Sequence, residues 1–309
     1  MLLLFVMRSR VEKSKQMTDV SLEHLSTVTY QPSSTNMLVF PNCKINLGLN
    51  ILCKREDGFH DIETIFYPVQ LLDALEVIQH PHSTSAVEFT CTGLMIDGEE
   101  EDNLCLKAYQ LLKKDHPQLP AVKMQLHKAI PLGSGLGGGS GDAAFLLKLL
   151  DKKFGLSLSS DQLHNYALQL GSDCPFFIIN KPCFASGRGE LLEEINIDLA
   201  AYQLVLVNPG IHISTGRAFS QVTPAIPQKN IKAIIQQPVE TWRTELVNDF
   251  EVPVLSSYPE IKNIKEELYR QGAVYVAMSG SGSTVFGLFR SLPPASLFSD
   301  TNYFIKIIT

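Results

Sequence analysis

Apolar and polar residues alternate along residues 45–53, which is the period of a β-strand that buries one face in a core. A shorter apolar run predicts another strand at residues 38–40. Along the longer strand, the alternation places Lys44 and Asn46 together on the face that does not enter the core. These two polar side chains are therefore expected to point the same way.

A turn and a returning strand are expected next. Asp57 and Gly58 form a hairpin-type turn signal, and residues 62–69 are rich in β-forming side chains. The second strand is thus predicted to lie beside the first, which places Phe59 and His60 at the turn or just past it.

A run of glycines between a strand and a helix is the most informative pattern. Residues 121–130 alternate like a strand, Pro131 ends it, and apolar residues recur with a helical period from Ala143 to Leu150. The eleven positions from Pro131 onward include six glycines, whose backbone can adopt positive φ angles and approach a ligand without a Cβ clash. This segment, called the glycine loop below, consists of Pro131, Leu132, Gly133, Ser134, Gly135, Leu136, Gly137, Gly138, Gly139, Ser140 and Gly141.

The glycine loop and the helix after it predict an anion site. A helix N-terminus carries about half a unit of positive charge, which suits a polyphosphate. A Walker A loop requires Lys after its glycines and none follows here, so a P-loop ATPase is excluded. The loop also fits the dinucleotide pattern G-x-G-x-x-G with Asp151 as the nearest acid, although so many glycines make that match nearly automatic. A flexible surface linker is the alternative that needs no ligand.

A second helix is predicted to begin and end at defined residues. Ser159 and Gln162 form a capping box, and Gly171 marks the C-terminal stop, so that Asp173 lies just beyond the helix. Residues 176–179 are expected to begin another strand.

The second half of the chain has the pattern of a separate α+β unit. An irregular polar stretch at residues 190–201 is typical of a domain junction. The elements expected after it are a strand at 204–207, helices near 231–242 and 261–271, and two strands at 274–278 and 284–289 around residues 279–283.

Composition narrows the class of protein. The 309 residues suggest two domains at about 150 residues each, and 26 Lys and Arg against 32 Asp and Glu give a net charge of −6, which disfavours a nucleic-acid partner. The longest apolar stretch, residues 1–7, is far shorter than the roughly 18 residues that cross a bilayer, so no membrane partner is expected.

The six cysteines form no C-x-x-C pair, which favours a reducing, cytoplasmic setting with each thiol buried as a small apolar group. They are Cys43, Cys53, Cys91, Cys105, Cys174 and Cys183.

Residues 1–36 are expected to form a loose leader. A short apolar start is followed by mixed basic and acidic residues and by a turn-like run at residues 31–34. A secretory signal would place its basic residues before the apolar run, which is not seen, and the acidic residues count against an organelle transit peptide, which stays open. Met37 is expected to be the true initiator, or the leader to be dispensable.

Three segments resemble, in order and spacing, the three motifs of the galactokinase, homoserine kinase, mevalonate kinase and phosphomevalonate kinase (GHMP kinase) superfamily. They are residues 41–47, the glycine loop and residues 279–283. Three further segments are similar to the family of 4-diphosphocytidyl-2-C-methyl-D-erythritol kinases within it, and they are residues 54–60, 101–104 and 170–177. The resemblance covers roughly residues 38–289.

This resemblance implies an α+β fold of two lobes with the active site between them. It implies a GHMP kinase domain like ribosomal protein S5 domain 2, with the ATP loop, at residues 37–190 and a ferredoxin-like domain at residues 191–309. The implied reaction transfers the γ-phosphoryl of ATP to the 2-hydroxyl of 4-diphosphocytidyl-2-C-methyl-D-erythritol in the non-mevalonate isoprenoid pathway. ATP is then the co-substrate, and Mg²⁺ is expected with ligands that the sequence does not assign.

The resemblance implies roles for the residues that would handle phosphate. Lys44 and Asp173 match the catalytic pair, and Asn103 matches an adenosine contact that joins the glycine loop in binding ATP. Phosphoryl transfer is catalysed mainly by positioning and charge neutralisation, which a cation, Mg²⁺ and a cradle of amides supply. Asp173 would accept or only orient the hydroxyl proton, and Lys44 nearby would keep Asp173 ionised.

The resemblance also implies an acceptor site. His60 matches the residue that reads the cytosine edge, while Phe59 and Phe219 match the aromatics on either side of that ring, where stacking is typically worth about 1–3 kcal/mol. The other residues expected to bind the acceptor are Asn46, Ser279, Gly280 and Ser281.

Simpler interpretations of the same residues stay open at this point. Lys44 is also compatible with an exposed strand lysine, Asp173 with a helix cap, His60 with a turn residue and Phe219 with a core phenylalanine. Residues 279–283 are also compatible with an ordinary hairpin turn.

Two positions depart from the pattern of the family. Phe59 stands where Tyr is usual, which keeps the stacking face and removes a hydroxyl. Asp142, just after the glycine loop, has no explained role beside a triphosphate unless it helps to hold the metal. Cys43 and Cys174 flank the expected catalytic pair, so thiol-directed inactivation there is a further hypothesis.

Other functions are weighed against this one. A second kinase of the superfamily, acting on mevalonate, homoserine or a sugar, has no use for a cytidine clamp formed by the residues near His60 and by Phe219. The hypothesis of an NAD-binding oxidoreductase rests on the weak match to the dinucleotide glycine pattern. The hypothesis of an RNA-binding module rests only on the S5-like fold. The expected partners are therefore small molecules, and the expected assembly is a monomer or a weak homodimer.

Overall fold

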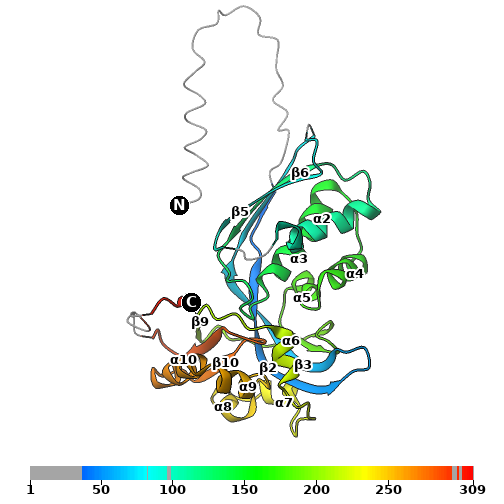
Figure 1. Ribbon diagram of the computed structural model, residues 1–309. Coiled ribbons are helices and arrows are strands. Elements are labelled where there is room, and N and C mark those ends of the chain that lie inside the picture. The colour runs from blue at the N-terminus through cyan, green and yellow to red at the C-terminus, as the bar shows by residue number, and fades with distance from the viewer. Residues whose placement is uncertain (1–36, 82, 96–98, 294–297, 299–300, 309) are drawn as a thin grey trace, which may run out of the picture. The chain divides into compact units, whose positions relative to one another are not determined.

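Three four-stranded sheets and the helices packed on them make up the described part of the chain (Figure 1). This computed structural model describes residues 37–81, 83–95, 99–293, 298 and 301–308. The expected loose leader at residues 1–36 lies outside the described residues. Mixed sheets and separate helices confirm the α+β class.

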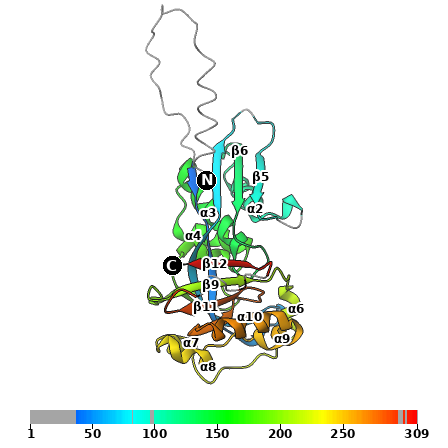
Figure 2. The same cartoon turned by 90° about the vertical axis from the view of Figure 1, so that its left-hand side faces the viewer.

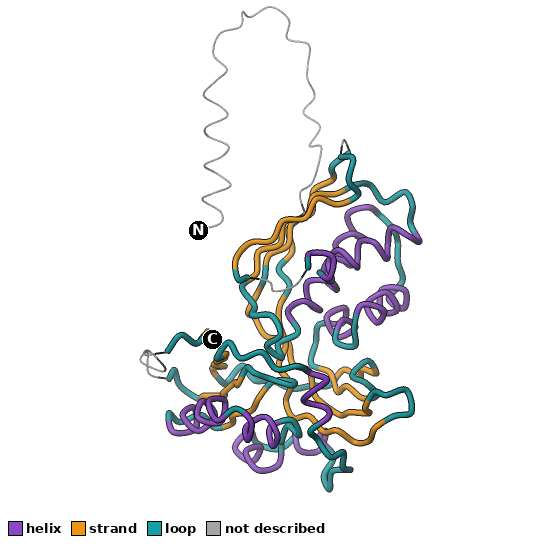
Figure 3. Tube along the Cα trace, viewed as in Figure 1, coloured by secondary structure: helices purple, strands orange, loops and turns teal. Residues whose placement is uncertain are grey.

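Among the described residues, helices cover one face of the first sheet (Figure 3). Its strand order is β1-β4-β6-β5, and β5 is parallel to β6 while the other pairs are antiparallel. The strands are β1 (Met37–Val39), β4 (Ala74–Gln79), β5 (Val87–Gly93) and β6 (Val122–Lys128). The helices are α2 (Leu104–Asp115), which follows the 3-10 turn η1 (Glu100–Asp102), α3 (Gly138–Phe154) and α4 (Ser160–Leu170). Figure 3 shows the helices on one side of these strands, where apolar side chains of both layers form one core.

The second sheet begins with the predicted hairpin. Strand β2 (Asn42–Lys54) pairs antiparallel with β3 (His60–Leu72), and Lys54 lies opposite His60 at the turn. The sheet continues through β7 (Cys183–Ser186) to β8 (Leu191–Glu194). The prediction of one core face for β2 was incomplete, because residues 42–50 are buried on both faces.

The third sheet confirms the strands expected in the second half. Its order is β10-β11-β9-β12, all antiparallel. Its strands are β9 (Gln203–Asn208), β10 (Tyr275–Met278), β11 (Val285–Phe289) and β12 (Phe304–Ile308). Its helices include α9 (Glu251–Ser257) and α10 (Pro259–Arg270), which lie along one side of the sheet in Figure 2 and share its apolar core. The other short segments are α6 (Thr215–Ser220), α7 (Ile231–Ile235), η2 (Val239–Thr241) and α8 (Trp242–Glu245).

Two predictions of secondary structure were wrong. Residues 176–179 belong to a helix, α5 (Cys174–Ile179), in which Pro175 occupies the first turn, where proline favours a helix start. Its phenylalanines pack against α3, so both faces of the segment are apolar and its pattern resembled a buried strand. The helix expected near 231–242 is broken into α7, η2 and α8, and Pro238 stands at the break.

Other local predictions hold. Ser159 and Gln162 form the capping box of α4, and Gly171 ends that helix. The expected division at residue 190 stays a prediction, and strand β8 on its far side pairs with β7 on its near side. Among the described helices, none combines the length and apolar character needed to span a bilayer.

The cysteines are free, and four of the six are buried as expected. Cys53 is exposed near the end of β2, where its Sγ lies 3.4 Å from Asp61 Oδ2, and Cys91 is half-buried in β5, so the expectation of a buried thiol was wrong for these two. Both lie near strand ends or at an edge of their sheets, which leaves part of each side chain uncovered.

Candidate active site

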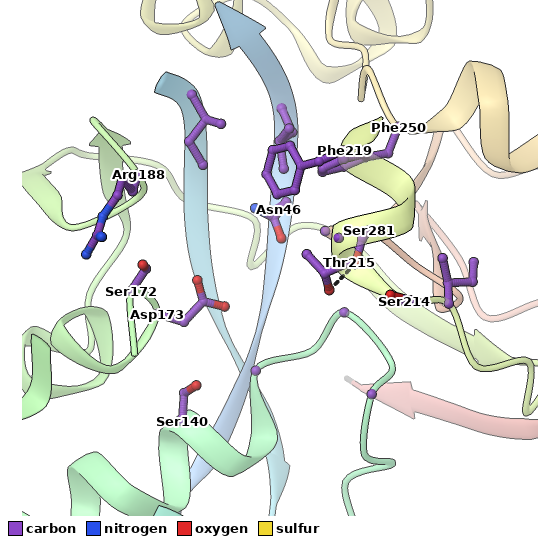
Figure 4. Close-up of a pocket in the computed structure, with 18 of the residues that line it drawn as sticks. Asn46, Ser140, Ser172, Asp173, Arg188, Ser214, Thr215, Phe219, Phe250 and Ser281 are labelled. Carbon is purple, nitrogen blue, oxygen red and sulfur yellow. Dashed lines mark hydrogen bonds between the residues drawn. The ribbon is translucent and has the colours of Figure 1, made fainter. Parts of the chain in front are cut away.

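A cavity of about 1150 Å³ lies where the β2–β3 hairpin, the glycine loop, α5, α6 and the loop between β10 and β11 meet. This is large enough for two ligands of moderate size. Figure 4 shows Asp173, Ser140 and Arg188 on one side of it and Thr215 and Ser281 on the other. The predicted site residues that line it are Lys44, Asn46, Phe59, His60, Pro131, Leu132, Gly133, Ser134, Gly135, Gly137, Gly138, Gly139, Ser140, Asp173, Phe219, Gly280 and Ser281.

Neighbouring backbone and side-chain atoms pack closely against the glycine loop. Gly135 has φ +80°, and a Cβ there would lie 2.0 Å from the carbonyl oxygen of Ser279. Gly137 has φ +68°, and a Cβ there would lie 3.2 Å from the side chain of Lys44. The alternative of a flexible linker is therefore wrong.

The loop leads directly into the N-terminus of α3. The N-cap residue is Gly137, and no side chain caps the first turn. The first N–H groups of a helix have no partner within the helix, so here they are available to an anion in the cavity. The geometry fits the predicted phosphate cradle.

Lys44 is a buried cation beside this cradle. Its side chain is 4% exposed, and its Nζ donates a hydrogen bond to Asn46 Oδ1 at 2.6 Å. Its backbone N donates to the carbonyl of Leu136 at 2.9 Å, which ties β2 to the glycine loop. The alternative of an exposed strand lysine is therefore wrong, and the two residues predicted to point the same way are in contact.

Asp173 forms an ion pair with Lys44 in the wall of the cavity. Its Oδ2 is 3.4 Å from Lys44 Nζ, and its side chain is 36% exposed. It stands at the N-cap position of α5, yet its side chain makes no capping hydrogen bond, so the helix-cap alternative is wrong. A partly exposed carboxylate beside a buried cation retains oxygen lone pairs for a ligand hydroxyl.

The loop of residues 279–283 joins β10 to β11 and also packs on the glycine loop. Ser279 is fully buried, and its Oγ donates to the carbonyl of Gly135 at 2.8 Å while accepting from the backbone N of Asn46 at 3.3 Å. Ser281 Oγ lies 3.1 Å from Thr215 Oγ1, the dashed contact in Figure 4. The segment is thus a hairpin connection that links three parts of the site.

The aromatic end of the cavity differs from the expected sandwich. The rings of His60 and Phe219 stack on each other, with centroids 4.7 Å apart and planes 13° apart. Phe59 is 51% exposed and faces the guanidinium of Arg188, 4.4 Å from its ring centroid. A base that enters between Phe59 and Phe219 has to displace His60 from Phe219 and Arg188 from Phe59, or stack on the ring faces that these two residues leave uncovered. The base-binding roles stay predictions.

Three predicted ATP residues and one predicted acceptor residue do not line the cavity. Leu136, Gly141 and Ser279 are packed behind it. Asn103 is the N-cap of α2, where its Oδ1 accepts from the backbone N of Cys105 at 2.9 Å, and the next residue, Leu104, reaches the cavity instead. Its adenosine contact stays a prediction.

Asp142 does not enter the cavity. It is buried in α3, and its Oδ2 accepts from Lys128 Nζ at 2.7 Å. The conditional expectation that it holds a metal is not supported, because Asp142 does not line the cavity and is bound to a lysine. No group of three or more acidic, cysteine or histidine side chains within the described ranges is arranged to hold a metal ion.

Cys43 and Cys174 are fully buried beside the predicted catalytic pair. Burial raises the pKa of each thiol to about 12, so neither forms the reactive thiolate at neutral pH. The hypothesis of thiol-directed inactivation at these positions finds no support.

The sequence analysis missed several polar residues that line the cavity, among them Ser172, Arg188, His212 and Thr215. Ser172 adjoins Asp173, and Thr215 stands four residues before Phe219. Closeness in sequence to a predicted site residue was therefore the only signal for these two, and it is a weak one. Arg188 lies in a turn and His212 in a loop, and no spacing connects either residue to the other motifs.

Comparison with known proteins agrees with this geometry. Residues 103–181 match the family described as GHMP kinases N terminal domain, and residues 230–300 match GHMP kinases C terminal. A 4-diphosphocytidyl-2-C-methyl-D-erythritol kinase of Bacteroides fragilis is 53% identical over 253 residues, which cover 82% of this chain and 92% of that protein. The chain belongs to the 4-diphosphocytidyl-2-C-methyl-D-erythritol kinase family. A Porphyromonas gingivalis member of this kinase family is 42% identical over 270 residues, covering 87% of this chain and 97% of the relative.

Solved structures place this kinase family among the GHMP kinase folds. A crystal structure of 4-(cytidine 5'-diphospho)-2C-methyl-D-erythritol kinase matches with a TM-score of 0.74 and 30% identity, covering 88% of this chain and 99% of that chain. The mevalonate kinase of Methanococcus jannaschii has a TM-score of 0.61 at 12% identity, covering 89% and 98%, which is a likeness of fold alone. The predicted GHMP kinase fold is confirmed.

Proposed function

We propose that this chain transfers the γ-phosphoryl group of ATP to the 2-hydroxyl of 4-diphosphocytidyl-2-C-methyl-D-erythritol, in the non-mevalonate route to isoprenoid precursors. Membership of the kinase family that bears this substrate's name supports the proposal. The observation that carries it is the pair formed by Lys44 Nζ and Asp173 Oδ2, 3.4 Å apart, in a cavity with a glycine cradle at one end and aromatic side chains at the other.

The glycine loop and the start of α3 bind the triphosphate in this proposal. Backbone amides of the loop and the helix N-terminus offer donors and positive potential to phosphate oxygens. Lys44 adds a fixed positive charge at the same end, since its side chain is held by Asn46 and by the ring of Phe66, 4.8 Å from Nζ. These groups neutralise charge on the phosphoryl group as it is transferred.

Asp173 orients the acceptor hydroxyl and takes its proton. The carboxylate oxygens are accessible, and one of them lies 3.4 Å from Lys44 Nζ. A carboxylate held next to the cation that binds the γ-phosphoryl group brings nucleophile and electrophile together, which is the main source of rate in such reactions.

The acceptor end recognises the cytidine part of the substrate in this proposal. His60 offers ring nitrogens at the edge of the cavity, and Phe219 and Phe59 offer ring faces. A mevalonate, homoserine or sugar kinase has no base to stack there, which favours the cytidyl acceptor over those of the other superfamily members. The glycine loop is shaped by contacts with Lys44 and Ser279 and is not part of a βαβ unit, so an NAD-binding oxidoreductase is not favoured.

Mg²⁺ accompanies ATP in this proposal. The ion usually binds one or two protein oxygens together with substrate phosphates and water, and the cavity offers the Ser140 hydroxyl and the Asp173 carboxylate at the start of two helices. When bound, Mg²⁺ neutralises charge on the β- and γ-phosphates. A cytoplasmic setting, small-molecule partners only, and a monomer or weak homodimer complete the proposal.

A substrate panel tests this function. The purified protein is incubated with ATP and Mg²⁺ and with the cytidyl diphosphate substrate, mevalonate, homoserine or galactose, and the phosphorylated product is followed by mass spectrometry. Product is expected only with the cytidyl diphosphate substrate. Lys44→Ala, prepared in the same way, controls for contaminating kinases. Turnover of mevalonate without turnover of the cytidyl substrate would reject the proposal.

A further inference from the structure

A cluster of three buried charges lies behind the glycine loop, outside the cavity. Lys128, at the end of β6, places its Nζ between the carboxylates of Asp73 and Asp142, and all three side chains are at most 3% exposed. None of the three lines the cavity. The proposed chemistry therefore leaves them without a role.

The cluster contacts both ends of the glycine loop. At the start, Asp73 Oδ1 accepts hydrogen bonds from the backbone N of Ala129 at 2.6 Å and of Ile130 at 2.9 Å, the two residues before the loop. At the end, Asp142 lies in α3, one residue after the loop, and binds Lys128 at 2.7 Å. The lysine thus connects the carboxylate that holds the entry of the loop to the one that holds its exit.

The same cluster also reaches the strand that carries Lys44. The backbone N of Asp73 donates to the carbonyl of Pro41 at 2.8 Å, next to the start of β2. The packing here is close, because a Cβ on Gly138 would lie 2.8 Å from Ile130 Cγ2 and 3.4 Å from Lys128 Nζ. A shift of the cluster would therefore move the loop, the start of α3 and the start of β2.

Stability is a weak explanation for this arrangement. Two carboxylates and one lysine carry an excess negative charge in a buried place, and Asp142 Oδ1 has no hydrogen-bond partner. Buried ion clusters of this kind contribute little net stability compared with apolar side chains, whereas their hydrogen bonds fix geometry.

We propose that Asp142, bound by Lys128, is a positioning residue for the donor nucleotide, because the Asp73–Lys128–Asp142 cluster holds both ends of the glycine loop in the shape that binds the triphosphate. The inference rests on the proposed function, since it needs ATP on this loop. It also gives Asp142 the role that the sequence left unexplained.

Three variants of the full-length chain test the proposal. Asp142→Ala removes the bond to Lys128, and Asp142→Asn keeps an oxygen that accepts it. Asp151→Ala is the matched control, because Asp151 lies on the same helix, far from the loop, and its Oδ1 accepts from the backbone N of Leu158 at 3.0 Å. All three variants remove a carboxylate from α3, but only Asp142→Ala removes the hydrogen bond to Lys128 that holds the end of the glycine loop.

The expected result is a change in the KM for ATP without a change in the KM for the acceptor. Asp142→Ala should raise the KM for ATP about tenfold, as expected for loss of one charged hydrogen bond, and leave the acceptor KM within about twofold of wild type. Asp142→Asn should restore most of the ATP affinity, and Asp151→Ala should lower the melting temperature without altering either KM. If Asp142 has a merely structural role, Asp142→Ala and Asp151→Ala should change the KM for ATP and the melting temperature alike, or folded Asp142→Ala should keep the wild-type KM for ATP. Either outcome overturns the proposal.

Binding of ADP gives a second readout that does not involve the acceptor. Calorimetric titration of the same variants with ADP should show the same tenfold loss for Asp142→Ala and none for Asp151→Ala, about 1.4 kcal/mol in binding free energy. If the substrate panel fails while this difference is present, the proposed acceptor is wrong and the positioning role stands. If Asp142→Ala does not fold, Asp142→Ser, whose hydroxyl is too short to reach Lys128, takes its place with the same expected result.

Discussion

At the phosphate end of the cavity the side chains are buried and hydrogen-bonded, whereas at the acceptor end they are exposed and stacked on one another. Lys44 is held by Asn46 and Leu136, and Ser279 is held by Gly135. Phe59 is half exposed, and His60 rests on the face of Phe219. The side chains of the first end are already held by contacts within the protein, while those of the second would exchange ring contacts for contacts with a base in the proposed function.

In the proposed function, this difference follows from what each end binds. A transferring phosphoryl group is stabilised by donors that are already in place, because reorganising them during the reaction costs free energy. A base is bound by stacking, which tolerates variation in position. The rigid end is therefore expected to determine the rate, and the open end the choice of acceptor.

The largest effect is expected where the two ends meet. Lys44→Ala and Asp173→Asn should each lower kcat by about 10² or more, because each removes a group that acts on the transferred phosphoryl or on its acceptor. Single-turnover kinetics on folded variants measures this. Asp161→Asn, an exposed carboxylate in the first turn of α4, is the control and should keep the wild-type rate. A wild-type kcat in either active-site variant would remove that residue from the mechanism.

A smaller effect is expected from disturbing the shape of the glycine loop. Gly135→Ala places a Cβ 2.0 Å from a backbone oxygen at φ +80°, so the loop has to move and the KM for ATP should rise by at least about tenfold. Gly155→Ala is matched to it, since Gly155 also has a positive φ, +61°, but nothing lies within 4 Å. That control should lose only about 1–2 kcal/mol of unfolding free energy and keep its KM. Equal KM values in the two variants would mean that the contact with Ser279 does not shape the site.

The smallest effect is expected at the acceptor end. Phe219→Ala and Phe59→Ala should each raise the acceptor KM about tenfold, within the 1–3 kcal/mol range of base stacking, and leave the KM for ATP unchanged. Phe40→Ala controls for the loss of an exposed phenylalanine, because Phe40 is 52% exposed and does not line the cavity. If Phe219→Ala leaves the acceptor KM unaltered, Phe219 is a residue of the apolar core and does not bind the acceptor.

The sequence predicted best those elements whose signals are local. The β2–β3 hairpin follows from alternation and from Asp57 and Gly58, and α4 follows from its capping box. The pattern of α5 misled because its phenylalanines are buried on more than one side. Strands β4, β5 and β12 and helix α2 were not predicted, since their alternation is short or irregular and their place depends on partners distant in the chain.

The site was predictable in part for the same reason. Glycines that need positive φ are visible in a sequence, so the phosphate cradle could be inferred from the residues themselves. The contact of Lys44 with Asp173 joins positions far apart in the chain and could be expected only from the family resemblance. The stacking of His60 on Phe219 and of Arg188 on Phe59 depends on side-chain rotamers, which no spacing determines.

The β2–β3 hairpin has one more consequence. Lys44 lies near one end of β2, and His60 lies opposite the other end, with the strands between them joined by backbone hydrogen bonds. The distance between the two residues is therefore set by the paired strands and not by a ligand. In the proposed function, an acceptor too short to reach both residues would gain nothing from His60, so the enzyme is expected to select acceptors by length as well as by chemistry.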